Sequence, residues 1–165
     1  MSVSRAVPTR WRDAGGPRRA RGMTLLELLA AMTTVGILAA IALPAYDQHV
    51  RTAKVAAASA DILMIQQRIT QYLTINNCLP PDLAAIQADN VLDPWGRPYV
   101  YLNFAGLKGK GQMRKDRNLV PINTQYDLYS VGADGQSRPP LTAPVSHDDV
   151  ILANDGNYIG LAANY

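Results

Sequence analysis

The sequence predicts an α+β protein, in which one long N-terminal helix packs through its second half on a small C-terminal antiparallel sheet. Three observations carry this prediction. A run of 19 uncharged residues, 28–46, is followed by an amphipathic stretch that no glycine or proline interrupts as far as residue 76, and short segments rich in aromatic and β-branched residues come after it. A chain of 165 residues has room for one domain and little more.

The charge of the chain is concentrated at its N-terminus. Residues 1–22 hold six arginines and one acid, a net charge of +5. Of the 16 basic and 13 acidic residues in the whole chain, 10 and 12 lie from residue 23 onward, a net charge of −2. The positive net charge therefore comes from residues 1–22 alone, and it does not indicate a nucleic-acid partner.

A second basic cluster lies within ten residues of the C-terminal part. Its members are Lys108, Lys110, Arg114, Lys115 and Arg117. No aromatic residue is interleaved with them, so stacking on nucleic-acid bases has no support. We expect this cluster to lie at the solvated tip of a hairpin, and we expect no nucleic-acid partner.

The apolar run 28–46 is just long enough, at about 1.5 Å per residue, to cross the hydrocarbon core of a membrane as a helix. The arginines before it place residues 1–22 in the cytoplasm and the chain after Tyr46 outside, by the positive-inside rule. A secretory signal peptide also has a basic start, but its apolar core has roughly 7 to 15 residues. Here the run is longer, and the helical pattern continues past its end.

Glu27 is unusual because it stands at the head of this apolar segment. An acid at the centre of a membrane helix costs roughly 2.5 to 3.5 kcal/mol, and less near the N-terminus, where the helix dipole attracts anions. Two interpretations follow. Glu27 is a first-turn acid that reaches the membrane interface, or it neutralises a buried ammonium group.

The stretch RGMTLLELL (residues 21–29) resembles the class III leader of type IV pilins and type II secretion pseudopilins, and the resemblance continues through residues 36–46. It implies that a prepilin peptidase cuts between Gly22 and Met23 and methylates the new amino group of Met23. It also implies that Glu27 pairs with this amine in a neighbouring subunit. Charges about 4 Å apart attract by roughly 4 kcal/mol at an effective dielectric constant near 20. Met23 stands where phenylalanine is more frequent, and the leader is longer than most.

The helix is expected to continue into the C-terminal part. Apolar residues recur at alternating gaps of three and four: Val55, Ala58, Ile62, Ile65, Ile69 and Tyr72. We expect this stripe to pack on the sheet, Pro44 to kink the helix, and the helix to end near residue 76, before Pro80 and Pro81. The expected segments are a leader (1–22), a membrane and assembly helix (23–46), an amphipathic helix (47–76) and a periplasmic sheet domain (77–165).

Within the last segment, residues 98–102 and 126–131 are predicted to be paired strands, with their turn at 106–111. Residues 83–90 are predicted to form a short helix. Cys78 is the only cysteine, which excludes an intrachain disulfide and a C-x-x-C metal pair. We expect it to be a small packed hydrophobic residue.

The run DPWGRPY (residues 93–99) resembles the DPWG-x-PY motif of the major pseudopilin of type II secretion. We interpret it as structural. Pro94 and Gly96 suit a tight turn, and Trp95 supplies a large anchor for the core.

Residues 126–135 and 148–150 resemble the closing motif of the same pseudopilin, which binds calcium in that family. The resemblance implies that the ligands are the carbonyls of Val131 and Gln136 and the side chains of Asp134, Ser146, Asp148 and Asp149. Carboxylates, carbonyls and hydroxyls suit Ca²⁺, which takes six to eight oxygens. The intervening loop, 135–147, is longer than the pseudopilin pattern has. The alternative is a solvated acidic turn.

The resemblance implies a structural subunit of a pseudopilus, which polymerises through its N-terminal helix to drive protein export by a type II secretion system. The implied partners are copies of itself, minor pseudopilins, inner-membrane platform proteins, the prepilin peptidase and the membrane. The implied location is the bacterial inner membrane, crossed once, with the N-terminus cytoplasmic and the C-terminal domain periplasmic. The chain lacks G-x-S-x-G, P-loop and H-E-x-x-H motifs, and no enzyme is expected.

The alternative function is that of a type IV pilin or minor pilin, in a surface or DNA-uptake filament. That class often closes its domain with a C-terminal disulfide, which a single cysteine cannot make. Whether the chain is a major or a minor subunit stays open at this point.

Overall fold

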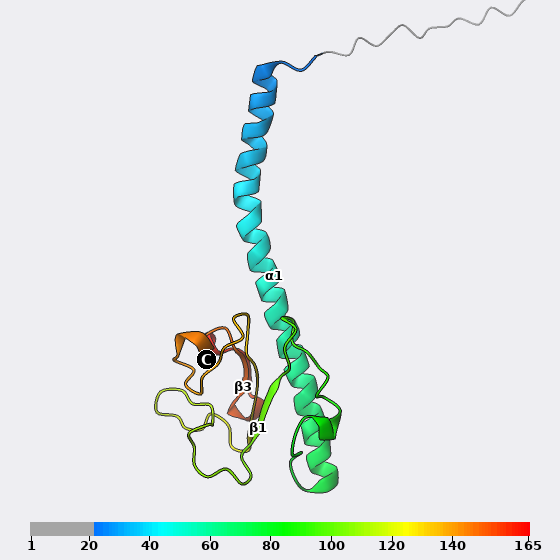
Figure 1. Ribbon diagram of the computed structural model, residues 1–165, viewed down its shortest axis with the longest axis vertical. Helices are drawn as coiled ribbons and strands as arrows, with labels where there is room; N and C mark the ends of the chain where they lie inside the picture. Colours follow the sequence, from blue (N-terminus) through cyan, green and yellow to red (C-terminus); the bar gives the residue numbers. More distant parts are fainter. Residues whose placement is uncertain (1–21) are drawn as a thin grey trace, which may run out of the picture. The chain divides into compact units, whose positions relative to one another are not determined.

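The computed structural model describes residues 22–165 (Figure 1). The predicted cytoplasmic leader therefore lies outside the described residues, apart from Gly22. The chain divides into two compact units at the bond between Ala42 and Leu43. Helix α1 (Leu25–Asn76) contributes residues to both units, and its helical assignment continues through Pro44.

The N-terminal unit contains the first turns of α1, with every described side chain exposed. Among these are large apolar residues such as Leu25 and Leu26, which are 79% and 78% exposed. In the described part of the chain, α1 is the one helix that is long and apolar enough to cross a membrane. The predicted membrane helix is thus present as a helix whose apolar surface has no partner in its own unit.

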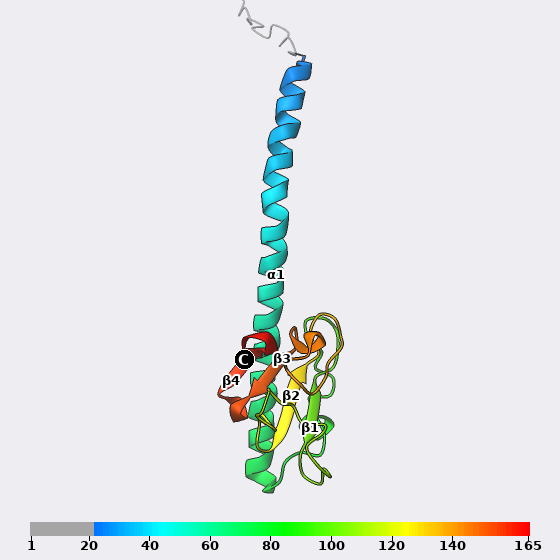
Figure 2. The ribbon, with the colours of Figure 1, turned by 90° about the vertical axis from the view of Figure 1, so that its left-hand side faces the viewer.

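The C-terminal unit holds one sheet of four antiparallel strands in the order β1-β2-β3-β4 (Figure 2). The strands are β1 (Val100–Asn103), β2 (Tyr126–Ser130), β3 (Val150–Ala153) and β4 (Tyr158–Leu161). In the register, Val100 lies opposite Tyr129 and Val150 lies opposite Leu161. The two predicted strands are confirmed with small shifts of their ends, whereas β3 and β4 were not predicted.

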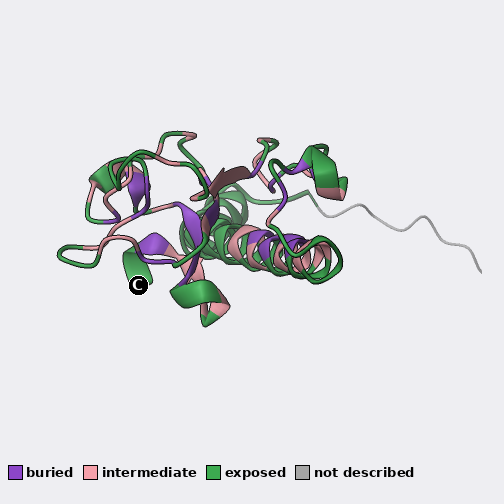
Figure 3. Cartoon of the chain, turned by 90° about the horizontal axis from the view of Figure 1, so that it is seen from below, coloured by how far each residue is buried: buried purple, intermediate pink, exposed green. Residues whose placement is uncertain are grey.

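The second half of α1 covers one face of this sheet, and its buried stripe faces the strands (Figures 2 and 3). Ala58, Ile62, Ile65 and Ile69 are all at most 1% exposed, which confirms the predicted packing face. They form one core cluster with Leu128, Leu152 and other buried residues of the unit. The helix ends at Asn76, as expected.

A second core cluster contains Ile151 and Ala153 of β3, together with Ile122, Leu141 and Ala162. Because side chains alternate along a strand, Val150 and Leu152 belong to the first cluster and Ile151 and Ala153 to the second. All four residues of β3 are buried. This strand is therefore covered on both faces, which explains its uninterrupted apolar sequence.

Three local predictions are corrected by the structure. The predicted helix 83–90 is a single 3₁₀ turn, η1 (Ala84–Ile86). The connection between β1 and β2 is the long segment 104–125 rather than a tight turn. Cys78 is exposed rather than packed, because it lies just after α1 ends.

Three more 3₁₀ turns lie between and after the last strands: η2 (Pro144–Ser146), η3 (Asn154–Gly156) and η4 (Ala162–Asn164). In η3, which joins β3 to β4, Asn154 and Asp155 have φ values of 52° and 55°. The Asp155 side chain stabilises this turn by accepting hydrogen bonds from the backbone N–H and the hydroxyl of Thr124.

Candidate functional site

The predicted processing and assembly residues lie at the start of α1. Gly22 and Met23 precede the helix and are exposed, and Glu27 lies in its first turn. The Glu27 backbone N–H donates to Thr24 Oγ1 at 3.2 Å, so Thr24 is the N-cap residue. The sequence signal for this cap was the T-x-x-E spacing, which is typical of a capping box. Among the described residues the Glu27 carboxylate has no ion-pair partner, which leaves it accessible to a group from another chain.

The DPWG turn is held by Asp93, a buried acid that sequence reasoning treated only as part of the motif. Its Oδ1 accepts hydrogen bonds from the backbone N–H groups of Trp95 and Arg97, at 3.0 and 2.8 Å. Its Oδ2 accepts a hydrogen bond from Ser130 Oγ, at the end of β2. Gly96 has a φ of +84°, which suits the predicted tight turn. The motif is thus a structural link between this turn and the sheet.

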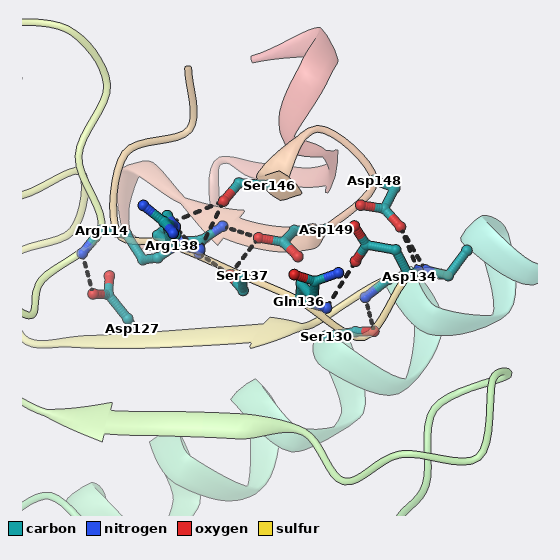
Figure 4. Close-up of polar contacts among 12 residues, drawn as sticks. Arg114, Asp127, Ser130, Asp134, Gln136, Ser137, Arg138, Ser146, Asp148 and Asp149 are labelled. Atoms are coloured by element: carbon teal, nitrogen blue, oxygen red, sulfur yellow. Dashed lines mark hydrogen bonds and ion pairs between the residues drawn. The ribbon is translucent and has the colours of Figure 1, made fainter. Parts of the chain in front are cut away.

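The acidic loop, defined here as residues 131–149, is organised by its own carboxylates (Figure 4). Asp148 Oδ2 accepts hydrogen bonds from the backbone N–H groups of Ala133 and Asp134, at 2.7 and 2.9 Å. Asp134 Oδ1 accepts one from the backbone N–H of Gln136 at 2.7 Å. The two ends of the loop are therefore joined through Asp148.

The loop also approaches its neighbours closely. Gly132 has a φ of +66°, and a Cβ there would lie 2.3 Å from the carbonyl oxygen of Asp148. Arg97, from the DPWG motif, donates hydrogen bonds to the carbonyl oxygens of Gly132 and Ala133. Gly132 is therefore required by space as well as by conformation.

Asp149 is separated from the other two acids by its surroundings. It is fully buried and forms an ion pair with Arg114, whose Nη2 lies 2.5 Å from Asp149 Oδ2. This is a correction, because the sequence analysis placed Arg114 on a solvated hairpin tip. Lys108, Lys110 and Arg117 of the same cluster are exposed as expected, whereas the side chain of Arg114 is only 2% exposed.

The electrostatics of the site follow from this burial. Burial raises the pKa of Asp149, and the Arg114 guanidinium and the Ser137 hydroxyl act in the opposite direction. Burial also raises the pKa of Asp127, whereas hydrogen bonds from the Arg114 backbone N–H and the Asn123 amide lower it. Both carboxylates therefore depend on specific donors for their charged form.

The structure brings together some of the predicted calcium ligands. Asp134, Gln136 and Asp148 are linked by hydrogen bonds within the loop. Ser146 is different, since its Oγ accepts from the backbone N–H of Arg138 and donates to the Arg138 carbonyl oxygen. Asp149 is paired with Arg114. Within residues 22–165, no three His, Cys, Asp or Glu side chains are grouped so that they could hold a metal ion.

Of the six implied ligands, Ser146 is hydrogen-bonded to the backbone of Arg138, and Asp149 is paired with Arg114. Calcium binding stays a prediction that only a binding measurement tests. On the outer side of the loop, Asp134 and Asp148 line a surface hollow of about 790 Å³ together with Arg51 and Lys54 of α1.

The helix and the sheet domain together indicate a general class of protein. An exposed apolar helix with an acid in its first turn, joined to a small sheet domain, is the arrangement expected of a filament subunit with a cleavable leader. Residues 17–43 match the prokaryotic N-terminal methylation motif. This match covers the predicted cleavage position, Glu27 and most of the apolar run.

Comparisons over more than two thirds of the chain identify the family. The type II secretion system core protein G of Pseudomonas aeruginosa is 31% identical over 140 residues, which cover 72% of this chain and 87% of that protein. The core protein G of Escherichia coli is 26% identical over 137 residues, covering 70% of this chain and 83% of that protein. The chain belongs to the type II secretion system core protein G family.

Pilins are also similar to the chain. The type IV major pilin protein PilE1 of Neisseria gonorrhoeae is 31% identical over 132 residues, covering 78% of this chain but only 61% of that pilin. No solved structure matches this chain. The relatives named here are secretion-system and pilin proteins, and none carries the name of an enzyme.

Proposed function

We propose that this protein is a structural subunit of a pseudopilus, which polymerises through its N-terminal helix to drive protein export by a type II secretion system. The observation that carries the proposal is Glu27, unpaired among the described residues, in the first turn of a helix whose exposed, apolar N-terminal part matches the methylation motif. Membership of the core protein G family supports the secretion role over a surface pilus.

The proposed assembly step is electrostatic. Cleavage after Gly22 creates an ammonium group on Met23, four residues before Glu27. Each charge is costly in a membrane, but the two together attract by roughly 4 kcal/mol at an effective dielectric constant near 20. Within one chain, Thr24 caps the helix between them. Among the described residues the Glu27 carboxylate has no ion-pair partner, so it is free to pair with the Met23 amine of an adjacent subunit, which would set the axial register of the filament.

The location and the partners follow from the same proposal. The chain would cross the inner membrane once, with the leader in the cytoplasm and the sheet domain in the periplasm, as the leader arginines favour. Its partners would be other copies of itself, minor pseudopilins, platform proteins of the inner membrane and the prepilin peptidase. An exposed apolar helix has to contact either lipid or other helices, and both are present in such an assembly.

Processing gives the first prediction. Gly22→Ala should block cleavage, so the purified protein should keep its full leader, whereas the wild type should begin at methylated Met23. Intact-mass and N-terminal peptide mass spectrometry of protein from the native membrane measures both. Gly36→Ala, on the same exposed helix but away from the cleavage site, is the control and should be processed normally. A wild-type N-terminus at any residue other than Met23 would contradict the assignment.

The alternative, a type IV pilin in a surface or DNA-uptake filament, makes a different prediction for a deletion strain. Loss of a pseudopilin should stop export of secreted proteins into the medium while surface filaments and DNA uptake stay intact. Normal export combined with loss of surface filaments would favour the alternative.

A further inference from the structure

The acidic loop has to accommodate three carboxylates, and one of them, Asp149, has no contact with solvent. A buried carboxylate is strongly unfavourable unless a positive charge and hydrogen-bond donors compensate it. The family resemblance assigns this task to a divalent cation. In this chain, a residue from a different segment already occupies the position beside Asp149.

That residue is Arg114, from the long connection between β1 and β2 (Figure 4). Its Nη2 contacts Asp149 Oδ2, and its Nη1 donates to Ser137 Oγ at 2.5 Å and to the Arg138 carbonyl oxygen at 2.9 Å. Ser137 Oγ in turn donates to Asp149 Oδ2 at 2.6 Å. One guanidinium thus compensates the buried carboxylate and binds two other atoms of the acidic loop.

The position of Arg114 is fixed by its own backbone and by the sheet. Its N–H donates to Asp127 Oδ2 at 2.6 Å, and its carbonyl oxygen accepts from the N–H of Ile122. The guanidinium carbon lies 4.3 Å from the centre of the Tyr129 ring on β2, within the range of a cation–π contact. Contacts therefore fix both the backbone and the guanidinium of Arg114.

We propose that the Arg114 guanidinium is the cation of the acidic loop, so that the loop closes without a metal ion. An arginine is always charged and presents several donors in a planar fork, so it can replace an ion that binds oxygens from several segments. A divalent cation at Asp149 would be repelled by the guanidinium beside it. Ser146, another implied ligand, is already bonded to the backbone of Arg138. Asp134 and Asp148, the remaining acids, are held by backbone N–H groups of the loop.

One atom of Asp149 bears on the choice between Arg114 and a metal ion as the cation of the loop. Asp149 Oδ1 is buried and has no hydrogen-bond partner among the described residues. A metal ion in the loop would use this oxygen. Calcium is therefore the appropriate probe, because a loop that needs the ion should become more stable when it is added, by mass action.

The test uses the full-length protein purified in detergent micelles, with unfolding followed by near-ultraviolet circular dichroism. The wild type should melt at the same temperature, within about 1 °C, in 1 mM EGTA and in 2 mM CaCl₂. Elemental analysis should find no bound calcium. Arg114→Gln should lower the melting temperature by roughly 10 °C in both buffers, because it leaves Asp149 buried and unpaired.

Arg117→Gln, an exposed arginine of the same connection, is the matched control and should melt like the wild type. Arg114→Lys should recover part of the loss, because it restores the charge but not the planar fork. A rise of several degrees in the wild-type melting temperature with calcium, or one calcium ion bound per chain, would overturn the proposal. So would an Arg114→Gln variant as stable as the wild type. None of these outcomes bears on whether the protein assembles through Glu27.

Discussion

At the scale of single residues, the fold depends on a few buried carboxylates that link segments far apart in the sequence. Asp93 joins the DPWG turn to Ser130 on β2, and Asp149 joins the acidic loop to Arg114. Each accepts hydrogen bonds from buried or part-buried donors. These acids therefore stabilise the C-terminal unit through specific contacts, and their substitution has predictable effects.

Asp93→Ala should lower the free energy of unfolding by about 2 to 4 kcal/mol. The substitution leaves two backbone N–H groups and the buried Ser130 hydroxyl without acceptors. Denaturant unfolding of the full-length protein in micelles measures the loss. Asp89→Ala removes an exposed acid close by and should change stability by less than about 0.5 kcal/mol. Equal losses in the two variants would show that Asp93 has no special role in the turn.

The pH dependence of stability should report on Asp127. Burial raises its folded-state pKa above the unfolded value of about 3.9. A raised carboxyl pKa means that the folded state binds the proton more tightly. The contribution is then fully present below the unfolded pKa, and it is lost as pH rises through the folded pKa.

The stability advantage of the wild type over Asp127→Asn should therefore be largest below about pH 4 and should shrink toward pH 7. Unfolding curves of both proteins at several pH values test this, with Asp89→Asn, which removes an exposed carboxyl, as the control. An advantage that grows toward pH 7 would mean that the hydrogen bonds from Arg114 and Asn123 lower the pKa more than burial raises it.

The sequence allows a family motif to be recognised where its residues lie close together along the chain. Gly22, Met23 and Glu27 lie within nine consecutive residues, and the motif match covers them. Arg114 could not be identified, since its partner Asp149 is 35 positions away and it stands in a cluster of basic residues along the sequence. In the sequence, a buried arginine among surface lysines looks the same as an exposed one.

At the scale of elements, α1 could be predicted over its whole length and β3 could not. The apolar residues of α1 recur over several turns, and this periodicity identifies both the helix and its buried face. By contrast, β3 has only four apolar residues, which periodicity cannot distinguish from a helical fragment. Its assignment follows from the pairing with β2 and β4, which is a property of the whole sheet.

The packing face of α1 gives a prediction at this scale. Ile62→Ala should cost about 2 to 5 kcal/mol, because Ile62 is fully buried in the main core cluster. Leu63→Ala, the next residue on the same helix, is 46% exposed and should cost much less. Denaturant unfolding of both variants compares the two faces directly. A similar cost for both would contradict the packing of this face of α1 on the sheet.

At the scale of the whole molecule, the two units have different requirements. The C-terminal unit has its own two core clusters, whereas the described N-terminal residues are all exposed, with no apolar core of their own. The N-terminal part of α1 therefore needs lipid or other copies of the chain. Lipid would cover this apolar surface while the chain is anchored in the membrane. Helices of neighbouring subunits would cover it in the proposed filament.

The central claim is that Glu27 sets the assembly of this filament by pairing with the Met23 amine of a neighbouring subunit. Electron microscopy of filaments from the native host tests it most directly, in strains that carry wild-type protein, Glu27→Ala or, as the control, Asp47→Ala on the same helix. The account predicts ordered filaments for the wild type and Asp47→Ala, and none for Glu27→Ala despite normal processing at Gly22. Glu27→Ala filaments with the helical order of the wild type would contradict it.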